Sequence, residues 1–147
     1  MSKFDLIIRG GTVATASDTF KTDVGVRAGK IVALGHDLGK AERTIEAEGQ
    51  LVLPGGIEAH CHIEQESSTR IMTADDFYSG SVSAAFGGNT TFIPFAAQHR
   101  GQNLRDVIKT AHDRAGPKSV IDYAFHLIIS DPTENRSEEN TSELQSQ

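Results

Sequence analysis

Two histidines separated by one residue, His60 and His62, have the types and the spacing that most clearly suggest chemistry in this sequence. Residues i and i+2 of a β-strand point to the same face, so both imidazoles can aim at one point while Cys61 faces away. Neutral imidazole nitrogens bind zinc at about 2.0–2.1 Å. A His-x-His pair also arises by chance, so the elements around it must decide whether it binds a metal.

The residues on either side of the pair predict a strand before it and a helix after it. A break at Pro54-Gly55-Gly56 precedes a short strand that leads into His60. Thr73-Ala74-Asp75-Asp76 has the pattern of a capping box with Thr73 as the N-cap, and the helix is expected to run to about Phe86, before Gly87-Gly88. This context favours metal binding by the two histidines.

The alternation of strands and helices continues along the chain. Residues 90–94 are rich in β-branched types and predict a strand. Apolar residues at helical spacing from Leu104 to Ala111 predict a second helix, which Gly116-Pro117 ends. Val120–Ile129 is nearly continuous in apolar character and predicts a long strand buried on both faces. A β-α-β-α-β order is typical of a doubly wound sheet or the start of a (β/α)₈ barrel, which three strands cannot close.

The first part of the chain, residues 1–53, predicts only short strands. Leu6-Ile7-Ile8 is expected to form a strand closed by Gly10-Gly11, and Ala28-Gly29-Lys30 is expected to form a hairpin turn. Such strands with glycine turns indicate part of a small β-sandwich or barrel. We therefore predict an α/β chain in which 1–53 belongs to a small β domain and 54–135 begins a larger fold.

Composition adds limits on the setting of the protein. The chain has 147 residues, a formal net charge of −6 and one cysteine, so it offers no intrachain disulfide. The negative charge argues against nucleic acid or an anionic membrane as a partner. The sequence shows no signal peptide and no apolar run near the roughly 18 residues of a membrane span. These features predict a soluble cytoplasmic protein.

The tail 136–147 differs in kind from the rest of the sequence. It has one apolar residue, no usable periodicity and a strongly polar composition, which predicts disorder. It also resembles the translation of a common sequencing-adapter oligonucleotide. We therefore expect this tail to be non-native and the native reading frame to be cut near Asn135.

Several motifs together resemble the dihydropyrimidinase/hydantoinase branch of the amidohydrolase superfamily. They cover about nine-tenths of the chain and comprise Asp5-Leu6-Ile7-Ile8-Arg9-Gly10-Gly11, Pro54-Gly55-Gly56-Ile57, His60-Cys61-His62, Thr73-Ala74-Asp75-Asp76-Phe77-Tyr78-Ser79-Gly80, Gly87-Gly88-Asn89-Thr90-Thr91 and Asp122-Tyr123-Ala124-Phe125-His126. The resemblance implies a metal-dependent (β/α)₈ barrel that holds two divalent ions, usually zinc, bridged by a carboxylated lysine. It also implies a homo-oligomeric enzyme that opens small cyclic amides or ureides, such as hydantoins and dihydropyrimidines, to N-carbamoyl amino acids.

The resemblance assigns roles to only a few residues of this chain. His60 and His62 correspond to the first two metal ligands, and 63–72 correspond to a loop that borders the substrate pocket. Within that loop Glu64, Gln65 and Glu66 could contact substrate, although a solvated loop is the simpler interpretation. The bridging lysine and the acid/base aspartate lie beyond the chain end, so the chain alone is expected to be an inactive N-terminal fragment.

Other polar residues have structural interpretations. Glu58 stands where much of the family has aspartate and is expected on the same side as His60. Lys118 precedes a strand, so it lies at the wrong end of a barrel to bridge metals. His126 is expected to be hydrogen-bonded in the core. His99 and His112 are expected at the surface, Cys61 as a small buried apolar group, and Asp75 and Asp76 as charges that favour a helix N-terminus.

Two alternatives remain beside the dihydropyrimidinase/hydantoinase interpretation. One is another cyclic amidohydrolase, of the allantoinase or dihydroorotase kind. The other is a non-catalytic, dihydropyrimidinase-related structural protein that keeps the fold and loses metal ligands. The presence of both His60 and His62 argues against the structural protein.

Overall fold

The computed structural model describes residues 3–67 and 71–132, and the chain divides into two compact units, Met1–Pro54 and Gly55–Gln147. The tail 136–147, predicted to be disordered and non-native, lies outside the described residues. In the described part of the chain, no helix is long and apolar enough to cross a membrane.

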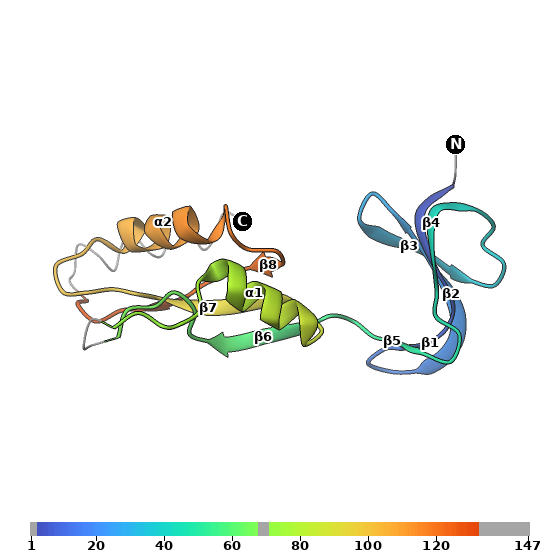
Figure 1. Cartoon of the computed structure of the whole chain (residues 1–147), viewed down its shortest axis with the longest axis horizontal. Helices are drawn as coiled ribbons and strands as arrows, with labels where there is room; N and C mark the ends of the chain where they lie inside the picture. Colours follow the sequence, from blue (N-terminus) through green and yellow to red (C-terminus); the bar gives the residue numbers. More distant parts are fainter. Residues whose placement is uncertain (1–2, 68–70, 133–147) are drawn as a thin grey trace. The chain divides into compact units, whose positions relative to one another are not determined.

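The first unit is a five-stranded sheet in the order β3-β2-β1-β4, with β5 also paired to β1 (Figure 1). Neighbours β1, β2 and β3 run antiparallel, whereas β4 and β5 run parallel to β1. The strands are β1 (Phe4–Ala14), β2 (Thr19–Arg27), β3 (Lys30–Gly35), β4 (Ala41–Glu46) and β5 (Leu51–Val52). The expectation that this region consists of β-strands is confirmed, but β1 with 11 residues and β2 with 9 residues are longer than the short strands that we predicted.

The glycine pair in β1 makes a bulge rather than a strand end, so that part of our prediction is wrong. The register of β1 on β2 shifts between Ile8 and Gly11, and the strand continues to Ala14. Gly10 has φ +70° and donates its N–H to the Asp23 carboxylate over 2.9 Å. A residue with positive φ lets the strand absorb an extra residue without ending.

The predicted hairpin between β2 and β3 is confirmed at Ala28 and Gly29. Their φ angles are +49° and +71°, and the flanking Arg27 and Lys30 are paired across the two strands. Positive φ at both central residues is what a two-residue turn needs to match the twist of the strands.

The second unit is a parallel sheet covered by two helices. The sheet has the order β6-β7-β8 (Figure 1). A further strand, β9, also pairs with β7. The elements are β6 (Gly56–Cys61), α1 (Phe77–Phe86), β7 (Asn89–Ala97), α2 (Leu104–Ala115), β8 (Asp122–Tyr123) and β9 (His126–Ile128). The predicted β-α-β-α-β order with parallel strands is confirmed.

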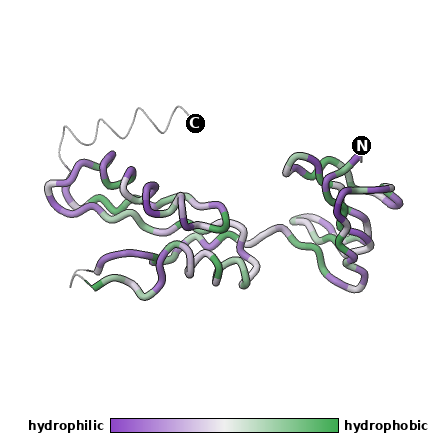
Figure 2. The backbone as a smooth tube through the Cα atoms, turned by 45° about the horizontal axis from the view of Figure 1, so that its top comes forward, coloured by the Kyte–Doolittle hydropathy of each residue, from purple (hydrophilic) through white to green (hydrophobic). Residues whose placement is uncertain are grey.

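Both helices pack on one face of β7. Phe92 on this face is fully buried and shares a core with Phe77 of α1, Ala115 of α2 and Ile63. Apart from its buried residues Leu104, Val107 and Ala115, α2 is largely hydrophilic (Figure 2), as expected for a helix with one buried face. The opposite face of β7, which carries Phe95, therefore has no helix of the described residues on it.

The cap of α1 differs from the prediction. Asp76, not Thr73, is the N-cap: its carboxylate accepts the Ser79 N–H over 2.9 Å, and the Ser79 hydroxyl accepts the Asp76 N–H. This reciprocal pair is a capping box displaced by three residues along the chain. The Thr73 hydroxyl is engaged elsewhere, because it accepts the Gln65 N–H and donates to the Asp75 carbonyl.

The predicted single strand from Val120 to Ile129 is also wrong, because the segment forms two short strands. The chain breaks between them at Ala124 and Phe125, where the Phe125 ring packs edge-on against Phe77 with centroids 6.1 Å apart. Val120 is 50% exposed and Ile129 is 47% exposed. Apolar character alone therefore did not mark burial on both faces.

Candidate metal centre

His60 and His62 lie together at the carboxyl end of β6, as their spacing predicts. Their ring centroids are 5.5 Å apart at an interplanar angle of 77°, and both side chains are exposed. β6 is the first strand of the parallel sheet, and β7 pairs alongside it. The structure therefore presents two imidazoles side by side at one edge of this sheet.

A bulge in β6 separates these histidines from Glu58. Glu58 pairs with Phe92 and Cys61 pairs with Pro94, so three steps along β6 match two steps along β7. Because Phe92 and Pro94 share the face that the helices cover, Glu58 and Cys61 face the helices together. The expectation that Glu58 lies on the side of His60 is therefore wrong, because the bulge reverses the alternation between them. The Glu58 carboxylate instead accepts the His60 backbone N–H over 2.9 Å.

Cys61 faces away from its two histidine neighbours and packs against the core, as predicted. Burial raises the pKa of its thiol above the ordinary value, and the nearby Glu58 charge raises it further. A raised thiol pKa keeps the sulfur protonated and unreactive. The site therefore consists of imidazoles, with the cysteine sulfur directed away from it.

The ring of Phe95 packs against both histidine rings. It stacks on His62 with centroids 5.1 Å apart and 17° between the planes, and it meets His60 edge-on at 4.8 Å. Phe95 occupies the face of β7 that the helices leave free, so it limits how far either imidazole can swing. No motif in the sequence indicated that Phe95 would contact the histidines.

His126 is hydrogen-bonded, as expected, but it is exposed rather than buried in the core. Its Nε2–H donates to the Ala59 carbonyl over 2.9 Å, within the bulge of β6, and its ring lies 5.2 Å from that of Phe95. The difference arises because the strand breaks at Phe125 before β9 begins. The Phe125 ring, and not that of His126, then packs against the core. His99 and His112 are exposed, as predicted.

Gln65 contacts His62 through its side chain. Its Oε1 lies 2.7 Å from Nδ1 of His62. An amide oxygen can only accept, so Nδ1 carries a proton, and in the neutral ring Nε2 is then the nitrogen with the lone pair. The sequence marked Gln65 only as a loop residue near the pocket, and a contact three positions along a loop has no sequence signature.

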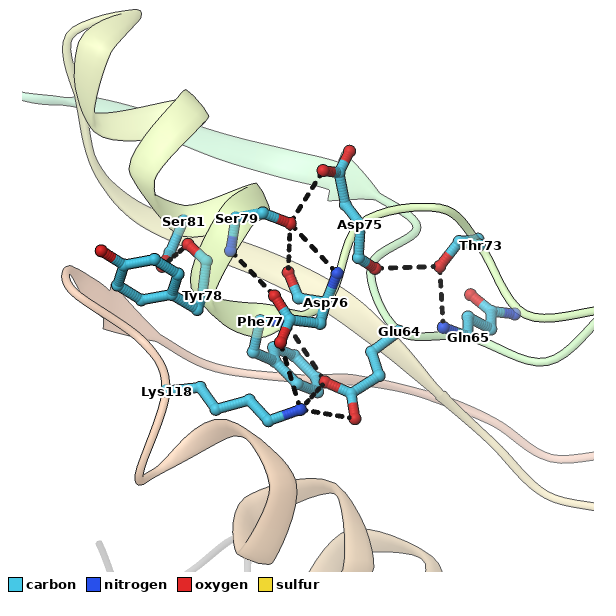
Figure 3. Close-up of polar contacts among 10 residues, drawn as sticks. All are labelled: Glu64, Gln65, Thr73, Asp75, Asp76, Phe77, Tyr78, Ser79, Ser81 and Lys118. Carbon is cyan, nitrogen blue, oxygen red and sulfur yellow. Dashed lines mark hydrogen bonds and ion pairs between the residues drawn. The ribbon is translucent and has the colours of Figure 1, made fainter.

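Glu64 and Lys118 form an ion pair beneath the same loop (Figure 3). The Lys118 ammonium lies 2.8 Å and 3.0 Å from the two Glu64 oxygens and 3.3 Å from Asp76. Contact with Glu64 raises the pKa of Lys118 above its ordinary value, and the interaction with Asp76 adds to this. Lys118 is thus a structural partner for the Glu64 carboxylate. Glu66 is exposed, and its backbone forms an isolated antiparallel bridge with Met72.

The two aspartates before α1 act at the helix N-terminus, as expected (Figure 3). Asp76 caps the helix, and the Ser79 hydroxyl donates to the Asp75 carboxylate over 2.9 Å. The Ser79 N–H lowers the pKa of Asp76 below its usual value, and Lys118 lowers it further. These contacts account for both carboxylates without a role in chemistry.

The donors at this site suit part of a metal centre. Within residues 3–67 and 71–132, no group of three or more His, Cys, Asp or Glu side chains is placed to hold a metal ion. Two neutral imidazoles are good ligands for zinc or a similar divalent ion, which normally takes four ligands. His60 and His62 therefore fit a metal that completes its coordination with groups other than those described.

The chain is similar over most of its length to curated cyclic-amide hydrolases. It is 44% identical to the D-hydantoinase of Ralstonia pickettii over 135 residues, which are 92% of this chain and 29% of that protein. It is 37% identical to the dihydropyrimidinase of Rattus norvegicus over 131 residues, or 85% of this chain and 25% of that one. No protein-family model matches the chain.

A solved structure shows the same arrangement. The crystal structure of dihydropyrimidinase from Brevibacillus agri matches with a TM-score of 0.89 and 41% identity, over 95% of this chain and 30% of that one. The chain thus spans about three-tenths of the length of the relatives that it matches.

Proposed function

We propose that this chain supplies the first two metal ligands of a cyclic-amide hydrolase. The chain belongs to the D-hydantoinase/dihydropyrimidinase family, as a homologue of the N-terminal region of its members. The observation that carries the proposal is the pair His60 and His62, adjacent at the carboxyl end of a parallel strand. Active sites of (β/α)₈ barrels are built at that end of the strands.

We further propose that the second unit is the start of such a barrel. Consecutive helices of a barrel all lie outside the closed sheet, whereas a doubly wound sheet has helices on both faces. Phe77 of α1 and Ala115 of α2 pack on the same face of β7, and Phe95 and the histidines lie on the other. This one-sided packing supports a barrel with the histidines directed inward.

Several residues of this chain would have defined roles in metal-dependent hydrolysis of a cyclic amide. When bound, two divalent ions, zinc in our proposal, would supply Lewis-acid activation of water and of the amide carbonyl of the substrate. His60 and His62 would bind through neutral ring nitrogens, and the Glu58 carboxylate holds the His60 backbone from the opposite face. The loop that follows His62 would border the substrate.

The proposed substrates are hydantoin and dihydropyrimidine rings, which open to N-carbamoyl amino acids. The proposed setting is a cytoplasmic homo-oligomer. A second candidate is an allantoinase- or dihydroorotase-like hydrolase, because a His-x-His pair by itself does not distinguish among these cyclic amidohydrolases. A structural protein without metal is disfavoured by the retained histidine pair.

A hybrid enzyme tests the proposal. Residues 1–132 of this chain would replace the matching region of the Ralstonia pickettii D-hydantoinase, and ring opening of hydantoin, dihydrouracil, allantoin and dihydroorotate would be compared with zinc added. We expect metal-dependent opening of hydantoin or dihydrouracil that is lost in His60→Ala and kept in His99→Ala. A soluble, zinc-loaded hybrid that opens neither ring would contradict the proposal, and preference for allantoin or dihydroorotate would favour the second candidate.

A further inference from the structure

We propose that Gln65 is a positioning residue for His62, set in place by a left-handed turn at Glu64 that Lys118 clamps. This inference rests on the proposed metal site and concerns how the chain aims one of its ligands. Three independent contacts carry it: the side-chain hydrogen bond to His62, the backbone pairing of Gln65, and the conformation of Glu64.

The side-chain contact selects one imidazole tautomer. Gln65 Oε1 accepts the Nδ1–H of His62 over 2.7 Å, so in the neutral ring Nε2 is the nitrogen with a free lone pair. Hydrogen bonds of this kind to the second nitrogen of a ligating histidine fix ring orientation and raise its basicity. The ring of Phe95 stacks on one face of the His62 imidazole, with the two centroids 5.1 Å apart.

The backbone of Gln65 is held at both of its polar groups. Its N–H donates to the Thr73 hydroxyl over 3.1 Å, and its carbonyl accepts the Thr73 N–H over 3.0 Å. Thr73 thereby fixes the backbone from which the glutamine side chain reaches back to His62. The threonine that the sequence suggested as a helix cap serves this loop instead.

Glu64 adopts a backbone conformation that L-residues with side chains rarely occupy. Its φ is +47°, in the left-handed region. The turn is held by its N–H to the Asp75 carbonyl over 2.9 Å and by its carboxylate, which accepts the Phe77 N–H over 3.2 Å. The Lys118 ammonium binds the same carboxylate (Figure 3).

Strain of this kind persists where surrounding contacts enforce it, and it often marks a place where geometry matters. A glycine would make the same turn without strain, but it would offer no carboxylate to the Phe77 N–H and Lys118. The strained backbone of Glu64 is therefore accompanied by two carboxylate contacts, to the Phe77 N–H and to Lys118, that a glycine could not make. The consequence is that the next residue, Gln65, points to His62.

The experiment uses the full chain with uniformly ¹⁵N-labelled histidine. Two-bond ¹⁵N–¹H correlation spectra of the metal-free protein identify the His62 tautomer, and zinc titration monitored against a chromophoric chelator gives the affinity. The variants are Gln65→Leu, which removes the acceptor, and Gln65→Glu, which keeps it. Gln50→Leu is the matched control, since Gln50 is an exposed glutamine in the other unit.

We expect His62 to carry its proton on Nδ1 in the wild type and to lose that preference in Gln65→Leu. Zinc affinity should fall about 10–100-fold in Gln65→Leu, remain near the wild-type value in Gln65→Glu, and be unaffected in Gln50→Leu. A wild-type Nε2–H tautomer, or a folded Gln65→Leu variant with unchanged affinity, would overturn the inference. Absence of zinc binding by the wild type would instead overturn the proposed metal site. Should Gln65→Leu not fold, the wild-type tautomer and Gln65→Glu still decide.

Discussion

Lys118 and Glu64 lie 54 positions apart in the sequence and form an ion pair with 2.8 Å between Nζ and Oε2. The Glu64 side chain is 17% exposed and that of Lys118 is 36% exposed, so the pair is shielded more than an ordinary surface pair. It joins the segment before β8 to the loop that follows the histidine pair. The arrangement of this loop therefore depends on a contact with a distant part of the chain.

Replacing Lys118 by methionine should destabilise this unit. The change keeps the apolar stem but leaves the Glu64 carboxylate without its cation, in a place from which water is partly excluded. The matched control is Lys109→Met, whose i,i+4 pair with Asp113 is 73% and 61% exposed and should contribute little. We expect a lower urea midpoint for Lys118→Met than for Lys109→Met, and equal midpoints would show that the pair is energetically neutral.

The charge of Asp76 should make stability depend on pH on the acid side. Its pKa is lowered from 3.8, chiefly by the Ser79 N–H, so its contribution is present above that value and is lost as the pH falls through the lowered pKa. Asp76→Asn keeps a good N-cap but cannot ionise. The gap between the urea midpoints of wild type and Asp76→Asn should be steady near neutral pH and close below about pH 4. A gap that persists unchanged to about pH 2 would exclude the carboxylate charge as its source.

The charge of Lys118 should make stability depend on pH in alkaline solution, in the direction opposite to that of Asp76. The pKa of Lys118 is raised from 10.5, chiefly by Glu64, so its contribution is complete below that value and is lost as the pH rises through the raised pKa. The wild type should therefore lose this contribution only in strongly alkaline solution. Lys118→Met should show no such loss in urea midpoints measured across the same range.

The order of elements and the histidine pair could be predicted because both depend on local patterns. Alternating apolar residues, glycine breaks and the i, i+2 spacing of His60 and His62 are properties of neighbouring residues. The cap of α1 was misplaced by three residues because Thr73 and Asp76 are both good N-cap types. Its true position depends on the Thr73 hydroxyl being taken by Gln65.

The remaining features depend on contacts that sequence spacing does not encode. The bulge that moves Glu58 to the helix face is a mismatch between β6 and β7, visible only when both strands are paired. The role of Gln65 depends on the turn at Glu64, which in turn depends on Lys118. The division of Val120–Ile129 into two strands follows from the packing of Phe125 on Phe77.

Phe92 should be the most sensitive core position of the second unit. It is fully buried between the two helices, so Phe92→Ala should lower the free energy of unfolding by about 3–5 kcal/mol. Phe86 is 92% exposed, and Phe86→Ala should change it by no more than about 0.5 kcal/mol. Chemical denaturation of both variants checks the assignment, and similar losses would mean that the helices do not pack on the Phe92 face.

The chain by itself should not open cyclic amides. A two-metal centre holds its ions about 3.5–4 Å apart with bridging ligands. Among the described residues, no group of three or more His, Cys, Asp or Glu side chains is placed to hold a metal ion, and His60 and His62 supply two imidazoles without a bridging ligand. Assays of the 147-residue chain with hydantoin and dihydrouracil, with zinc or manganese added, should show no turnover above buffer. Metal-dependent turnover by a monodisperse preparation would show that other residues complete the ligand set.

Zinc K-edge X-ray absorption of the full chain loaded with less than one equivalent of zinc tests the metal centre most directly. We expect imidazole scattering with Zn–N distances of about 2.0–2.1 Å, lost in His60→Ala/His62→Ala and retained in the control His99→Ala/His112→Ala. Those control histidines are exposed. Unchanged imidazole scattering in His60→Ala/His62→Ala would contradict the assignment of these residues as metal ligands.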